Sequence, residues 1–186
     1  MRFSRVIADT RRCRHNDRVP TDFLSLFRTL EDAGVRYVVV GGLAVLLHGV
    51  DRITADVDLV IDLAPDEATR AIRALTGAGF RPALPVDPKG LADEQTRQRW
   101  RDEQGMLVLS FWDPENRRPT VDVFTKAPLD FPQLWTSAQV MNISGYQIRV
   151  ASLPHLIEIK RRSGRPRDIE DADRLEQLQH DQKEAP

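Results

Sequence analysis

Three aspartates in two segments of alternating polarity are the residues of this chain best suited to chemistry. Asp56 and Asp58 stand two residues apart in DVDLVI, and Asp122 lies at the centre of TVDVF. Because alternate residues of a strand point to the same face, Asp56 and Asp58 are expected to project together. Carboxylates that close repel one another unless a positive charge lies between them. Mg²⁺ takes oxygen ligands and often binds substrate phosphates as well, so the sequence predicts a metal site that handles a nucleotide.

The segments next to the first two aspartates predict the elements that must position them. Residues 37–40 (YVVV) are typical of a buried strand, and Gly41 and Gly42 of a turn into a short apolar helix at 43–49. Residues 57–62 form the next predicted strand, which contains Asp58 and directly follows Asp56.

A hairpin is predicted further along the chain. Residues 106–111 form an apolar run, a turn follows at 112–116, and residues 120–124 return from it. Asp122 is thereby placed on the second strand of the hairpin. A weaker strand is expected at 146–150.

Helical patterns account for most of the remaining sequence. Helices are expected from Thr21 to Gly34, from Pro65 to about Gly77, around Gln95–Arg101, from Ser152 to about Arg162 and from Pro166 to about Gln179. Mixed strands followed by terminal helices indicate an α/β or α+β domain with helices gathered at its C-terminal end. We expect a flexible arm at 1–20, a core at 21–150 and a C-terminal helical segment of the same domain at 151–181.

Composition narrows the classes of function. The 186 residues carry 27 basic and 28 acidic side chains, so the net charge of −1 gives no global nucleic-acid signature. Local basic patches remain, with six arginines in the first 18 residues and five basic groups in KRRSGRPR at 160–167. Cys13 is the one cysteine, which excludes a disulfide framework. With no apolar run long enough to span a bilayer and no secretory signal, we expect a cytoplasmic protein.

The ordered set of motifs resembles the nucleotidyltransferase superfamily, and most closely its abortive-infection-type members, the toxins of type IV toxin–antitoxin systems, and the minimal nucleotidyltransferases. The resemblance covers about residues 36–178. Where many members have Gly-Ser, this chain has Gly41-Gly42. The matching residues are Gly41, Gly42 and Ala44; Arg52, Thr54, Asp56 and Asp58; Asp122; Leu156, Ile157 and Lys160; and Gly164, Arg165, Arg167, Asp168 and Asp171.

The resemblance implies a mixed sheet flanked by helices, with the carboxylates on adjacent strands. It implies transfer of a nucleoside monophosphate from a nucleoside triphosphate such as ATP to a hydroxyl, with two Mg²⁺ ions, or Mn²⁺ in their place, held by Asp56, Asp58 and Asp122. The acceptor is left open between a tRNA 3′ end, a protein and a small molecule. An antitoxin is an expected partner. The alternative is a non-catalytic antitoxin-like module on the same fold that binds a nucleotide or a partner.

Other residues have both a functional and a structural interpretation. Contacts to the nucleotide are expected from Gly41 and Gly42, from Arg52 and Thr54, and from Lys160 and Arg165. Arg52 and Thr54 suit equally a turn and the edge of a strand, and Lys160 and Arg165 also suit a solvated basic helix end. Asp168 and Asp171 are interpreted as stabilising charges near a helix N-terminus. His48 is expected to pack or cap, and the three tryptophans to pack in the core or at its edge.

Overall fold

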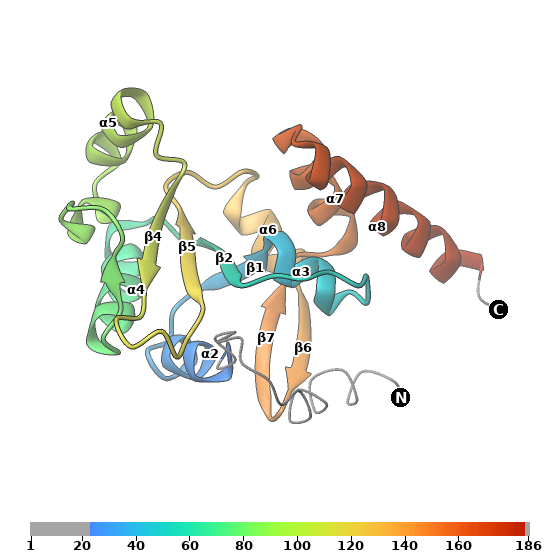
Figure 1. Ribbon diagram of the computed structural model, residues 1–186, viewed down its shortest axis with the longest axis horizontal. Coiled ribbons are helices and arrows are strands. Elements are labelled where there is room, and N and C mark those ends of the chain that lie inside the picture. Colours follow the sequence, from blue (N-terminus) through green and yellow to red (C-terminus); the bar gives the residue numbers. More distant parts are fainter. Residues whose placement is uncertain (1–22, 185–186) are drawn as a thin grey trace.

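The computed structural model describes residues 23–184, which form a mixed sheet with helices around it (Figure 1). The predicted arm at 1–20 and the start of the first predicted helix at Thr21 lie outside the described residues. The strands are β1 (Tyr37–Val40), β2 (Asp56–Ile61), β3 (Arg81–Pro82), β4 (Val108–Trp112), β5 (Thr120–Phe124), β6 (Gln139–Ile143) and β7 (Tyr146–Val150).

Helices lie before, between and after the strands. They are α2 (Phe23–Asp32), α3 (Gly41–Leu47), α4 (Pro65–Gly77), the 3₁₀-helix η2 (Pro88–Ala92), α5 (Glu94–Gln104), α6 (Phe131–Ser137), α7 (Leu153–Ser163) and α8 (Pro166–Glu184). Figure 1 shows α7 and α8 packed side by side at one end of the molecule. The mixed α/β fold with C-terminal helices is confirmed.

The sheet has the order β3-β4-β5-β2-β1-β7-β6. Strand β1 pairs antiparallel with β2 and parallel with β7, whereas β2 pairs parallel with β5. All four residues of β1 are buried, so other elements cover both faces of this strand. The polar residues of β2 and β5 therefore lie next to the centre of the fold.

Sequence periodicity located most of these elements. The hairpin is confirmed by the antiparallel pairing of β4 with β5, and the helix from Pro65 by α4. Two boundaries near the carboxylates were wrong. Helix α3 begins at Gly41 rather than at 43, and β2 begins at Asp56 rather than at 57.

Four elements were not predicted, namely β3, η2, α6 and β6. Strand β6 lies at the edge of the sheet, and none of its residues is fully buried. An edge strand of this kind shows no alternation of apolar and polar residues in the sequence. Helix α6 has only seven residues, with Asp130 as its N-cap, and is too short for a 3.6-residue period to be recognised.

Candidate functional site

Asp58 and Asp122 occupy directly opposed positions in the parallel strands β2 and β5. Val57 and Leu59, which flank Asp58, are fully buried on the other side of the sheet. The alternation expected from the sequence thus directs Asp58 away from the core, and Asp56 shares its face by the same alternation. Asp56 is itself exposed, two residues nearer the start of the strand.

Burial and mutual repulsion act together on these carboxyls. Burial is the main cause that raises the pKa of Asp58 to about 6, and the charge of Asp122 raises it further. The pKa of Asp56 is also raised, first by the partial burial of its carboxyl and then by the charge of Asp122. Lys160 and a backbone hydrogen bond from Gly42 oppose the shift at Asp58. The site thus holds acidic groups whose charged forms are only partly compensated.

Gly41 packs directly against the carboxylate of Asp58. Its φ of +65° lies in the left-handed region, and a Cβ placed on it would overlap the carboxylate of Asp58. Glycine is therefore required here both by the backbone and by the neighbouring side chain.

Two buried polar atoms near this turn have no hydrogen-bond partner among the described residues. One is Asp122 Oδ1, an acceptor, and the other is Arg52 Nε, a donor. Arg52 Nε lies against Gly42, because a Cβ on this glycine would be 2.8 Å from it and 2.8 Å from Thr54 Oγ1. Unpaired buried polar groups are uncommon and call for an explanation, such as an ion or a ligand.

Arg52 belongs to a network of buried ion pairs that also involves α7 and α8. The Arg52 guanidinium donates to Asp171 of α8. Asp171 also accepts from the Lys160 ammonium of α7 at 2.9 Å, and Lys160 in turn contacts Asp168. Ser163 donates to the other oxygen of Asp168. We call Arg52, Lys160, Asp168 and Asp171 the ionic network.

The network corrects the interpretation of the C-terminal motif. Asp168 does lie in the first turn of α8, but Asp168 and Asp171 are more than stabilising charges near a helix N-terminus, because they are 9% and 4% exposed and each contacts Lys160. Lys160 is 4% exposed, which excludes a solvated helix end for this residue. Its ammonium is directed to two carboxylates, although its charge still acts on Asp58. The sequence showed the spacing of these residues but not the packing of α7 on α8 that buries them.

The two remaining arginines of the motif are exposed. Arg167 donates to the carbonyl of Ile53 at 3.1 Å and so ties the start of α8 to the loop before β2. Arg165 lowers the pKa of Asp168 by its charge, and no carboxylate of the described residues lies within ion-pair distance of its guanidinium. The described structure therefore brings Gly41, Gly42, Arg52 and Thr54 next to the aspartates but leaves Arg165 at the surface.

Most residues with a packing interpretation lie in packed positions, although Trp112, at the end of β4, is 42% exposed. His48 is buried at the end of α3, and burial lowers its pKa, so a neutral ring can donate from Nε2 to the Ala151 carbonyl at 2.7 Å. Trp100 is buried in the core. Trp135 stacks against the guanidinium groups of Arg36 and Arg149.

The acidic groups do not form a complete metal cage by themselves. Within residues 23–184, no three or more His, Cys, Asp and Glu side chains are grouped closely enough to hold an ion. Mg²⁺ commonly uses only one or two carboxylates together with waters and substrate phosphates. The opposed Asp58 and Asp122, with the unpaired Oδ1 of Asp122, fit a site of this open kind.

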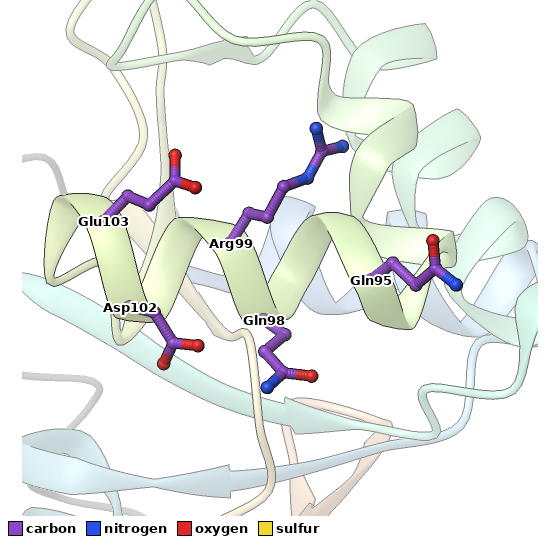
Figure 2. Close-up of a pocket in the computed structure, with 5 residues that line it drawn as sticks. All are labelled: Gln95, Gln98, Arg99, Asp102 and Glu103. Carbon is purple, nitrogen blue, oxygen red and sulfur yellow. The ribbon is translucent and has the colours of Figure 1, made fainter.

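A separate concavity of about 470 Å³ lies along the polar side of α5. Figure 2 shows its side chains projecting from a single helix, without a residue from β2 or β5. It is lined by Gln95, Gln98, Arg99, Asp102 and Glu103. This surface is not part of the carboxylate site.

No helix in the described part of the chain has the length and apolar character needed to cross a membrane.

Comparisons of the fold give one consistent result, although no protein-family model matches the chain and no curated protein matches its sequence. The lincosamide antibiotic adenylyltransferase LnuA, in a lincomycin-bound structure, is similar over 83% of this chain and 94% of its own, with a TM-score of 0.54 and 15% identity. A nucleotidyltransferase-like antigenic protein from Paracoccidioides brasiliensis matches over 86% and 76%, with a TM-score of 0.51 and 20% identity.

A third solved structure, of the antibiotic-resistance factor ANT(2″)-Ia, is similar over 86% of this chain and 88% of its own. Its TM-score is 0.50 and its sequence identity is 14%. At such low identity these similarities concern the arrangement of strands and helices. The chain has the nucleotidyltransferase fold.

Proposed function

We propose that this protein is a Mg²⁺-dependent nucleotidyltransferase that moves a nucleoside monophosphate from a nucleoside triphosphate to a hydroxyl group. The observation that carries the proposal is the opposition of Asp58 and Asp122 beside Gly41, on the fold that adenylyltransferases share. A binding module without catalysis gains nothing from carboxylates that lie so close together and repel one another.

The divalent cations would be held by Asp56, Asp58 and Asp122, with substrate phosphates completing their coordination. When bound, such ions neutralise charge on the transferring group and orient the attacking and leaving oxygens. The chain itself supplies a rigid base for these ligands, because Asp58 and Asp122 stand on paired strands whose opposite faces are buried.

The proposed reaction exchanges a phosphoanhydride bond of the nucleotide for a phosphate ester bond to the acceptor. The acceptor oxygen forms a bond to the α-phosphorus, while the bond from that phosphorus to the β-phosphate oxygen breaks and pyrophosphate leaves. The proton of the acceptor hydroxyl passes to a facing carboxylate and then to solvent. Asp122 suits this step, since its Oδ1 has no hydrogen-bond partner in the described structure.

The phosphates would be positioned next to the turn at Gly41 and Gly42. The absence of side chains there lets the backbone approach a polyphosphate, and Arg52 Nε is an unpaired donor beside the turn. Thr54 also lies against Gly42, although its hydroxyl donates to the Asp56 carbonyl at 3.3 Å. Lys160 would compensate charge from within the ionic network, and Arg165 would act from the surface.

The acceptor belongs to one of three classes: a small-molecule hydroxyl, a tRNA 3′ end or a protein hydroxyl. The similarity to LnuA and ANT(2″)-Ia supports a small molecule such as an antibiotic. The sequence motifs support the toxin type, for which RNA or protein is the acceptor and an antitoxin is the partner. The likenesses to LnuA and ANT(2″)-Ia extend over most of each chain, and they favour the small-molecule class among the three.

Labelled nucleotides test the proposal directly. The protein is incubated with each of four α-³²P-labelled nucleoside triphosphates and MgCl₂, together with total tRNA, a protein extract or a panel of aminoglycosides and lincosamides. Label is expected in one pool, with release of pyrophosphate and loss of both in Asp58→Asn. A protein that binds nucleotide but labels no pool and releases no pyrophosphate would instead support the non-catalytic module.

A further inference from the structure

The loop from Val50 to Ala55 carries Arg52 and is held by contacts from α8. The Arg52 guanidinium is bound by Asp171, and the Ile53 carbonyl accepts from Arg167. Both partners belong to the first two turns of α8, although they are more than a hundred residues away along the chain. The C-terminal end of the loop leads directly into β2 at Asp56, so the contacts from α8 act close to the carboxylates.

Asp171 has two cationic partners, whereas Asp168 has one. Asp171 accepts from both Arg52 and Lys160, while Asp168 accepts from Lys160 and from the Ser163 hydroxyl. The two carboxylates neutralise the two cations of the network. Consequently the network as a whole adds little net charge to the site, although the Lys160 charge still acts on Asp58, and the main effect of the network is to fix geometry.

The ionic network fixes the position of one unpaired hydrogen-bond donor, Arg52 Nε. The Nη1 atom of Arg52 is directed to Asp171, which leaves Nε buried against Gly42 without a partner. A planar guanidinium held at one edge presents its remaining N–H groups in a fixed direction. Burial lowers the pKa of Arg52 and the charge of Arg167 lowers it further, but Asp168 and Asp58 favour the charged form.

From this arrangement we infer that Asp171 is a positioning residue. It bridges Arg52 to Lys160 and so holds Arg52 Nε beside the Gly41–Gly42 turn, where the N–H donates to a phosphate oxygen of the bound ligand. The inference rests on the proposed function, since it takes the polyphosphate of the donor nucleotide as the ligand. It gives α8 a part in the site, because without Asp171 the long Arg52 side chain loses the contact that orders it.

Two variants separate positioning from folding. Asp171→Asn and Asp168→Asn each remove one buried carboxylate that contacts Lys160, so both are expected to lower the melting temperature. Only the first removes the contact to Arg52. Asp168→Asn is thus a control for stability, matched in burial and in its lysine partner.

Calorimetric titration with inorganic tripolyphosphate and MgCl₂ measures the effect at the ligand. We expect Asp171→Asn to weaken binding by about tenfold to a hundredfold, the range for loss of a charge-assisted contact, and Asp168→Asn by less than about threefold. The KM for the nucleotide should follow the same pattern, with a smaller change in kcat. The Arg52 Nε–H signal, assigned in ¹H–¹⁵N spectra by its loss in Arg52→Lys, should become exchange-broadened or shifted in Asp171→Asn alone.

Equal weakening in the two variants, in proportion to their loss of melting temperature, would overturn the positioning role and leave the transferase proposal intact. An unchanged Arg52 signal in Asp171→Asn would do the same. If the wild-type protein binds neither tripolyphosphate nor any nucleoside triphosphate with MgCl₂, the proposed function itself fails, and the ligand role of Asp171 fails with it.

Discussion

Asp58 and Asp122 face one another across two parallel strands, and the charge of Asp122 raises the pKa of Asp58. Two carboxyls in this relationship destabilise the folded protein when both are ionised. A carboxyl in an ion pair that stabilises the fold would instead have a lowered pKa. The relationship therefore has consequences for stability as well as for catalysis.

The stability of the metal-free protein should depend on pH through Asp58. Its pKa is about 6 in the folded protein and 3.8 in its ordinary state, so between these values the folded state binds more protons than the unfolded state. The contribution of Asp58 to stability is then fully present below about pH 4 and is lost as the pH rises through 6. Asp58→Asn should be the more stable protein at pH 7.5 by about 3 kcal/mol, and the difference should shrink towards pH 4.5.

Urea denaturation of both proteins at several pH values, with EDTA present, measures this difference. Added MgCl₂ should then stabilise the wild type and leave Asp58→Asn unchanged. If Asp58→Asn is much less stable than the wild type at pH 7.5 without metal, Asp58 is a structural residue and its assignment to the site is wrong.

Gly41→Ala should abolish nucleotide transfer. Alanine in the left-handed region costs about 1–2 kcal/mol, and here its Cβ would also displace the Asp58 carboxylate. Gly105→Ala is the matched control, because Gly105 has nearly the same φ of +63° with no atom within 4 Å of an added Cβ. Melting temperatures and labelling assays compare the two. Similar loss of activity in both variants would show that backbone strain alone is responsible.

Much of this site could be predicted from the sequence because its chemistry depends on short-range patterns. The two-residue spacing of Asp56 and Asp58 fixes a common face, and the turn at 112–116 brings Asp122 back on the strand next to β4. The glycine pair marks the point where β1 ends. These features are local, and their physical meaning does not depend on the rest of the fold.

The ionic network could not be predicted in the same way. Asp168 and Asp171 stand near a helix start, where exposed carboxylates are common, and nothing in the adjacent sequence distinguishes buried ones. Their burial depends on the packing of α7 against α8 and on a contact with Arg52 over a separation of 119 residues. Long-range pairing of this kind becomes visible only in three dimensions.

Lys160→Met should destabilise the protein strongly. The substitution removes the ammonium that Asp168 and Asp171 share and leaves both carboxylates buried, which typically costs about 3–5 kcal/mol. Arg161→Met on the exposed side of the same helix should have little effect, although Arg161 also pairs with two acidic residues of α8. Chemical denaturation at pH 7 compares the variants. A stable Lys160→Met protein would mean that the network contributes little to folding.

Asp122→Ala should separate nucleotide binding from transfer. Its loss removes the charge that raises the pKa of Asp58, so the metal-free protein should be at least as stable as the wild type. If Asp56 and Asp58 alone hold the metal that accompanies the triphosphate, nucleotide affinity should fall by no more than a few-fold, while transfer falls by more than about a hundredfold.

Equilibrium binding of a non-hydrolysable nucleotide with MgCl₂, beside the labelling assay, distinguishes these effects. Asp58→Asn provides the comparison, because the same proposal requires it to lose both binding and transfer. The unpaired Oδ1 of Asp122 gives the physical reason for the difference, since that atom is free to face the acceptor hydroxyl. Equal loss of nucleotide affinity in the two variants would show instead that Asp58 and Asp122 hold the same ion.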